Sequence, residues 1–202
     1  MLRAQCRRFM VGASLFAIGT APGFATLCGA DATNLLCFAG SWFFSSAALI
    51  QLLLSKPATS QTWKVPSTRA ECLSSAIQLF GTLNFNLSTG AAVWAQRVPA
   101  RRHLMWAPDA MGSAAFLVSG VLGIAAVAFG VGLVQLKSRL WLAASVSMVG
   151  SIAFGASAVG AFVTKTGMTE DARLAQLGTF VGALCFLIAA YLRLPRRKRA
   201  RA

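Results

Sequence analysis

Long apolar stretches alternate with short polar segments along the whole chain. Six stretches of about 21 to 26 residues have no charged residue in their middle, and most charges lie between them. Crossing the ~30 Å hydrocarbon core of a bilayer takes roughly 20 mainly apolar residues in a helix, which satisfies its own backbone hydrogen bonds. The pattern therefore predicts an all-α membrane protein with six transmembrane helices. The predicted spans are residues 10–30, 33–54, 70–95, 109–134, 140–164 and 174–194.

One motif recurs in all six stretches. Each contains a glycine followed by Ala, Ser or Thr, then a phenylalanine at +4 and a small residue at +7. The glycines of the first, third and fifth stretches are 69 and 69 residues apart, and those of the others 72 and 70 apart. This spacing predicts three tandem two-helix hairpins in a single membrane domain. The motif residues are Gly12 and Phe16, Gly40 and Phe44, Gly81 and Phe85, Gly112 and Phe116, Gly150 and Phe154, and Gly182 and Phe186. The domain covers 1–202, with repeats at about 8–55, 70–135 and 140–194 and a basic tail at 193–202.

The motif predicts a packing face. Positions i, i+4 and i+7 lie on one side of a helix. Small residues there let membrane helices approach closely, and the phenylalanine then fills the space over a neighbour's glycine. Because each unit would cross the membrane twice, the three units would be parallel repeats about an axis along the membrane normal.

The first stretch also fits a second interpretation. Arg3, Arg7 and Arg8 precede an apolar run that ends near Ala-Asp-Ala at 30–32, a pattern also found in cleaved signal peptides. Because this stretch carries the same glycine–phenylalanine motif as the other five, we expect it to be a retained helix.

The motif segments resemble a known family. The paired helices with Gly-Ser-x-x-Phe motifs are similar to YrhK-like domains of bacterial membrane proteins. The runs QLFGTLNFNLSTGAA (78–92) and WAPDAMGSAAFLVSG (106–120) resemble uncharacterised actinobacterial multipass proteins related to them. The resemblance covers most of the chain and implies a membrane domain of unassigned activity. The resemblance implies no catalytic residues.

Composition excludes a water-soluble fold, and charge predicts an orientation. Apolar residues make up 56% of the chain and charged residues 12%, about half of what a soluble domain carries. Nineteen Lys and Arg against five acids give a net charge of +14. With six crossings, 14 of these cations fall on the side of the two termini, so the positive-inside rule places both termini in the cytoplasm. The protein would lie in the cytoplasmic membrane, with its C-terminal tail attracted to anionic lipid headgroups. No nucleic-acid partner is indicated.

The third stretch is unusually polar. Its side chains must face other helices or a hydrated space, since facing lipid is unfavourable. Two interpretations remain open, namely interhelical hydrogen bonds and a pathway for a neutral solute lined by Asn84 and Asn86. The candidate polar site consists of Gln78, Thr82, Asn84, Asn86 and Ser88.

Three arginines lie in the predicted outer loop 97–109, against the overall charge bias. Arg97, Arg101 and Arg102 are candidates for contact with lipid headgroups or an anionic ligand, or for pairing with Asp109. The lone histidine, His103, lies in the same loop and has no second ligand at metal-binding spacing.

The sequence predicts no catalytic, cofactor-binding or metal-binding residues. The acids Asp31, Asp109, Glu170 and Asp171 fall at predicted helix N-termini and Glu71 opens the third helix, where carboxylates cap free amides. No C-x-x-C pair is present. Cys28 and Cys37 flank the first outer turn and either lie side by side, as a thiol chemistry would need, or are two isolated small side chains.

Three functional hypotheses follow. The sequence favours a non-enzymatic structural or interaction module of the membrane, because the recurring motif serves packing. The alternative is a small transporter or channel for a neutral or anionic solute that uses the polar third helix. The third is a thiol-based membrane enzyme, which would require Cys28 and Cys37 to come together.

Overall fold

The computed structural model describes residues 1–56, 60–94, 98–132, 134–164, 166 and 168–195. These residues are helical apart from turns, loops and an isolated bridge between Val163 and Thr169. The helices are α1 (Leu2–Thr20), α2 (Phe24–Cys28), α3 (Ala30–Ser55), α4 (Ser60–Trp63), α5 (Pro66–Trp94), α6 (Val98–Ala100), the π-helix η1 (Arg101–Trp106), α7 (Ala107–Val131), α8 (Arg139–Gly160) and α9 (Ala172–Arg193).

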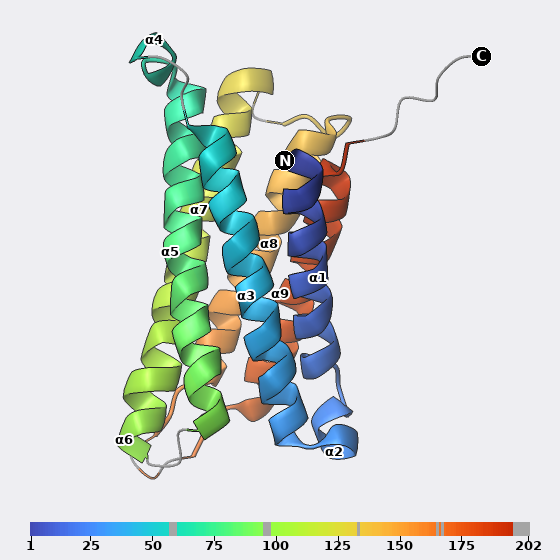
Figure 1. The fold of residues 1–202 in the computed structure, drawn as a ribbon, viewed down its shortest axis with the longest axis vertical. Helices are drawn as coiled ribbons and strands as arrows, with labels where there is room; N and C mark the ends of the chain where they lie inside the picture. Colours follow the sequence, from blue (N-terminus) through green and yellow to red (C-terminus); the bar gives the residue numbers. More distant parts are fainter. Residues whose placement is uncertain (57–59, 95–97, 133, 165, 167, 196–202) are drawn as a thin grey trace, which may run out of the picture.

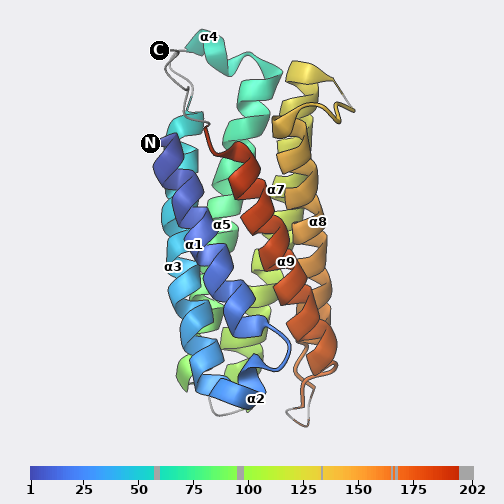
Figure 2. The ribbon, with the colours of Figure 1, turned by 90° about the vertical axis from the view of Figure 1, so that its right-hand side faces the viewer.

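The long helices form a closed up-and-down bundle (Figures 1 and 2). Along the ring, α1 packs on α3, α3 on α5, α5 on α7, α7 on α8, α8 on α9, and α9 returns to α1. The start of α1, the end of α9, α4 and the α7–α8 connection lie at one end, which we call the terminal end. The short helices α2 and α6 lie at the opposite end, the distal end. Each long helix therefore presents one side to a common axis.

Four helices are long and apolar enough to cross a membrane: α3, the continuous helix Arg101–Gly130, α8 and α9. This composition is compatible with a membrane protein. Helices α1 and α5 fall outside the group because α1 carries three arginines in its first two turns and α5 carries polar residues along its length. The all-helical fold class is confirmed, whereas the number of spans stays a prediction.

The boundaries of the first predicted span are wrong. The helix begins at Leu2 and ends at Thr20, rather than covering 10–30. It ends there because Pro22 cannot continue a helix and Gly23 adopts a left-handed conformation with φ +85°. The chain then makes the short helix α2 before α3 begins at Ala30.

The predicted outer loop 97–109 is also wrong over its described part. Residues 98–106 are helical and run directly into α7. The wide π turn lies just before Pro108, which has no amide hydrogen for a regular bond to the residue four positions earlier. Asp109 therefore lies in a continuous helix and not at a free helix end. By contrast, Asp171 caps α9 as expected, since its carboxylate accepts from the amides of Arg173 (3.0 Å) and Leu174 (2.9 Å).

The helix that contains Glu71 begins earlier than predicted. It starts at Pro66, a residue suited to the first helical turn because its missing N–H is not needed there. Glu71 thus lies in the second turn of α5 and does not open it.

Candidate functional site

The motif glycines lie in pairs at the crossing points of consecutive helices. A Cβ placed on Gly12 would lie 2.9 Å from the Gly40 carbonyl oxygen, and one on Gly40 would lie 3.0 Å from that of Gly12. The same reciprocal contact occurs between Gly81 and Gly112 at 3.1 and 3.0 Å. Gly150 and Gly182 repeat it, with 3.1 Å in both directions. Backbones meet at these points because no side chain separates them.

The motif phenylalanines gather on the bundle axis. Each covers the glycine of its partner helix: the Phe116 ring lies 3.0 Å from a Cβ built on Gly81, and the Phe154 ring 3.2 Å from one on Gly182. Within the hairpins, the ring centroids are 5.1 to 5.6 Å apart. Between hairpins, contacts of 5.2 to 6.4 Å join them into one cluster. We call this the phenylalanine cluster; it consists of Phe16, Phe44, Phe85, Phe116, Phe154 and Phe186.

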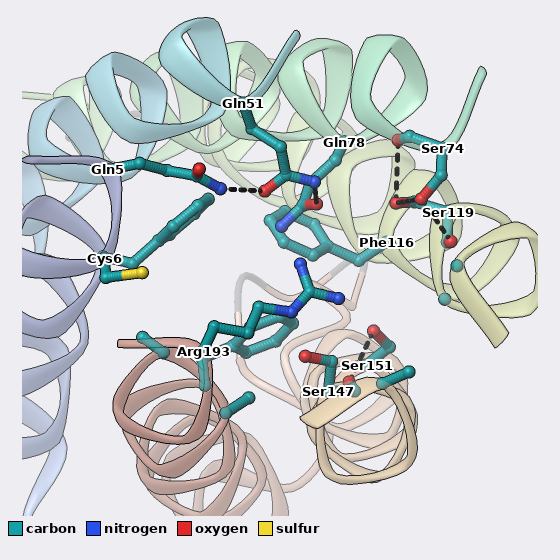
Figure 3. Close-up of a pocket in the computed structure, with 17 residues that line it drawn as sticks. Gln5, Cys6, Gln51, Ser74, Gln78, Phe116, Ser119, Ser147, Ser151 and Arg193 are labelled. Atoms are coloured by element: carbon teal, nitrogen blue, oxygen red, sulfur yellow. Dashed lines mark hydrogen bonds between the residues drawn. The ribbon is translucent and has the colours of Figure 1, made fainter. Parts of the chain in front are cut away.

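A cavity of about 50 Å³ lies on the terminal side of this cluster (Figure 3). We call it the inner cavity. Phe116 and Phe186 contribute to its apolar wall, and polar side chains from all six long helices complete it. These polar side chains are Gln5, Gln51, Ser74, Gln78, Ser119, Ser147, Ser151 and Arg193.

Hydrogen bonds order most of these polar groups. Gln5 Nε2 donates to Gln51 Oε1 (2.9 Å), and Gln51 Nε2 donates to Gln78 Oε1 (3.1 Å). These two hydrogen bonds join the neighbouring helices α1, α3 and α5 on the inside of the bundle. Ser74 and Ser119 exchange hydroxyl-to-carbonyl bonds of 2.8 and 2.9 Å between α5 and α7. The inner cavity thus has a preorganised polar wall.

Arg193 is the charged group of the inner cavity. Its guanidinium extends from the last turn of α9 toward the glutamine side of the cavity (Figure 3). Within the described part of the chain, its Nε is the only buried side-chain nitrogen or oxygen without a hydrogen-bond partner. Glu71 acts on it electrostatically but is an exposed residue, and no ion pair joins the two among the described contacts. The cavity therefore carries a net positive charge.

A larger cleft of about 490 Å³ lies on the distal side of the cluster. Asp109 and Arg101 line it, together with Asn34, Ser88 and Gln176. Asn34 Nδ2 donates to the Ala92 carbonyl (3.1 Å), and Gln176 Nε2 donates to the Ala21 carbonyl (3.2 Å). These bonds tie neighbouring helix ends together around the outer cleft.

The phenylalanine cluster separates the two spaces on five helices of the ring, and α8 reaches the cleft only through Ala161, just after its end. On α7, for example, Asp109 lines the outer cleft, Phe116 belongs to the cluster, and Gly123 lines the inner cavity. On α9, Gln176 lines the cleft and Arg193 the cavity, with Phe186 between them. Two polar spaces at opposite ends are thus divided by aromatic rings.

The predicted polar site on α5 is divided among different environments. Gln78 lines the inner cavity and Ser88 the outer cleft. Thr82 and Asn84 donate to carbonyls of their own helix, those of Leu79 (2.8 Å) and Phe80 (2.9 Å). With its amide nitrogen facing α3, Asn86 donates to Ser41 Oγ and to the Ser41 carbonyl, both at 2.9 Å. Asn86 thus makes the interhelical hydrogen bonds of the first interpretation, and neither Asn84 nor Asn86 lines either of the two spaces.

The outer arginines have different surroundings. Arg97 lies outside the described residues. Arg101 lines the outer cleft. Arg102 is bound within the protein, since its Nε (3.0 Å) and Nη2 (2.7 Å) both donate to the Val163 carbonyl and its guanidinium lies 5.6 Å from the Phe162 ring centroid. It therefore fastens η1 to the α8–α9 loop.

The cysteines carry free thiols, with Cys28 exposed and Cys37 buried. Among the described residues, no group of three His, Cys, Asp or Glu is arranged to hold a metal ion.

The sequence did not single out Arg193 and Gln51 as site residues, although their spacing from the motif indicates them. On each long helix, the residue seven positions from the motif phenylalanine in the direction of the terminal end lines the inner cavity. This residue comes before the phenylalanine in α1, α5 and α8 and after it in α3, α7 and α9. Two helical turns keep such a residue on the face of its phenylalanine. These six residues are Phe9, Gln51, Gln78, Gly123, Ser147 and Arg193.

No family model, curated protein or solved structure matches the chain. The resemblance to YrhK-like domains therefore stays a prediction, and the site is interpreted from its own residues.

Proposed function

We propose that the chain is an integral protein of the cytoplasmic membrane in which all six long helices span the bilayer as three hairpin repeats. Helix α5 fits a membrane-spanning helix despite its polar residues, because these residues point into the bundle. Ser74, Ser75 and Thr82 are buried, whereas Leu83 and Leu87 are 49% and 64% exposed. An apolar exterior around a polar interior suits lipid surroundings. The threefold glycine–phenylalanine contact supports the repeats.

The charge distribution supports cytoplasmic termini. Arg3, Arg7 and Arg8 at the start of α1, Lys56 and Lys137 all lie at the terminal end. Cytoplasmic segments of membrane proteins are enriched in such residues. The basic tail beyond 195 lies outside the described residues; attraction of its cations to anionic lipid headgroups remains part of the proposal.

Within this membrane domain, the geometry best supports a gated pathway for a small neutral or anionic solute. The observation that carries the proposal is the pair of polar spaces at opposite ends, separated by the phenylalanine cluster. A purely structural module has no need of an ordered polar wall and a charged side chain in its interior, since intramembrane ionisable groups are unfavourable unless they serve a function. Helix packing by the motif then forms the scaffold of the pathway.

Solute flux in proteoliposomes tests this function. We expect purified protein to increase the permeation of small polar solutes, supplied as a panel of urea, glycerol and sodium salts. Replacing Gln51 and Gln78 together by leucine should remove at least about nine-tenths of this flux, because the polar wall loses its hydrogen-bonding groups. Initial rates of solute uptake provide the measurement.

Asn84→Leu is the matched control. Asn84 lies on the same helix as Gln78 but donates to its own backbone and lines neither of the two spaces. Flux should survive this change. Flux no greater than that of empty liposomes, or equal loss in the control, would favour the structural or interaction module.

A further inference from the structure

We propose that the inner cavity is a binding site for a small monovalent anion, held by Arg193. This inference rests on the proposed pathway and names the class of solute that it takes. The guanidinium of Arg193 stays charged at all physiological pH values. Burying a charged nitrogen without a partner is unfavourable, and the Nε of Arg193 is in that state. The guanidinium extends into the cavity, so an anion bound there offsets its buried charge.

The groups around Arg193 fit an anion better than a cation. Gln78 uses its Oε1 to accept from Gln51, and its Nε2 makes no hydrogen bond within the described residues. The Ser147 hydroxyl is likewise without a partner in the described part of the chain, while the Ser147 carbonyl accepts from Ser151 (3.0 Å). Arg193, Gln78 and Ser147 face the same space (Figure 3). Three free donors around one space form an anion site.

Most of the other acceptors are already occupied, although Gln5 Oε1 accepts no hydrogen bond among the described residues. Gln51 Oε1 accepts from Gln5, and the Ser74 and Ser119 carbonyls accept from each other's hydroxyls. Cys6 is buried beside Phe9 in the cavity wall and contributes a weak donor. The lining therefore offers few free oxygen atoms to a cation and several free N–H and O–H groups to an anion.

The volume of the inner cavity limits the size of the ligand that it can bind. On the same measure a cavity needs roughly 10–15 Å³ to hold one water molecule, so a volume of about 50 Å³ admits a few water molecules or one small anion. Chloride, nitrate and formate are of this size. A phospholipid headgroup with its glycerol and acyl chains is far larger, so the proposal commits to a free anion.

Anion-dependent thermal stability of the purified protein tests the site. The sodium concentration is held constant while gluconate, which is too large for the cavity, is replaced by chloride, nitrate or formate. A ligand that binds only the folded state raises its melting temperature in a saturable way. We expect such a rise with at least one of the small anions. Arg193→Gln should weaken the apparent affinity about tenfold or more.

Two further variants sharpen the test. Gln78→Glu keeps the acceptor for Gln51 but places a carboxylate beside Arg193, so it should remove the anion effect by occupying the site itself. Arg8→Gln removes an exposed arginine from the same end of the bundle and should leave the effect unchanged. A wild-type protein that melts at the same temperature in all four salts overturns the proposal. An unchanged anion effect in both Arg193→Gln and Gln78→Glu does so as well.

The flux assay separates this inference from the pathway on which it rests. Saturable anion binding without flux of any solute would leave the site intact and overturn the pathway. Flux of urea or glycerol without an anion effect would keep the pathway and overturn the anion site.

Discussion

Replacing Gly112 by leucine is expected to disrupt the α5–α7 hairpin and to lower the free energy of unfolding substantially. A Cβ at position 112 would lie 3.0 Å from the Gly81 carbonyl oxygen and 3.1 Å from two atoms of the Phe85 ring. The backbone contact leaves no room for a rotamer change to relieve the clash. Overpacking typically costs about 1–3 kcal/mol, and we expect the upper end of this range because the clash involves a backbone carbonyl. The thermal unfolding midpoint in detergent should fall by about 6–12 °C.

Gly130→Leu is the control for this change. Gly130 lies on the same helix, α7, and a Cβ there would meet nothing within 4 Å. The control also shares the change in helix propensity, because both substitutions replace glycine by leucine within a helix. Equal melting temperatures for the two variants would show that the close glycine crossing contributes nothing to stability.

Phe116→Ala is expected both to destabilise the protein and to open a leak. Phe116 is 2% exposed and contacts Phe85, Phe154 and Phe186, so it joins two hairpins. Removing a buried phenylalanine costs about 3–5 kcal/mol. Because the ring separates the inner cavity from the outer cleft, its removal should also raise solute permeation severalfold in proteoliposomes, as hydrophobic constrictions close pores by excluding water.

Phe129→Ala provides the comparison. Phe129 lies on α7 as well, but it is 65% exposed on the outer surface of the bundle. Its loss should change neither the melting temperature by more than about 2 °C nor the flux. A leak of the same size in both variants would point to general loosening of the bundle rather than to a gate at Phe116.

Helices and motif contacts were largely predictable because they depend on local pattern. The glycine–phenylalanine spacing by itself placed Gly81 opposite a neighbouring helix, and the structure brings Gly81 and Gly112 together. The end of α1 was missed because apolar residues continue past Pro22, so hydropathy did not mark the break there. The helical segment around His103 was missed since three arginines and a proline suggested a loop, whereas a π turn accommodates Pro108.

The polar site was only partly predictable, because partners depend on tertiary packing. The sequence left Asn86 open to two interpretations, a solute pathway or interhelical hydrogen bonds, and in the structure it finds hydrogen-bond partners on α3. Arg193 was grouped with the basic tail because it adjoins Arg196 and Arg197 in the sequence. Its place on the face of Phe186, seven positions away, directs it into the bundle instead. The nearby arginines in the sequence suggested a residue of the tail, whereas the helical spacing from Phe186 indicates a residue on the inner face of α9.

One labelling experiment addresses the proposed membrane-spanning pathway as a whole. Single cysteines are placed at Thr33, which lines the outer cleft, and at Ser147, which lines the inner cavity, after the five native cysteines have been replaced by alanine. Ag⁺, a thiol-reactive ion no larger than the ions that the inner cavity admits, is applied in chloride-free buffer to spheroplasts and to inverted membrane vesicles. We predict that Thr33→Cys reacts only in spheroplasts and Ser147→Cys only in inverted vesicles. Reaction of either cysteine from the opposite side, or of neither from any side, would contradict two water-accessible spaces separated by the phenylalanine cluster.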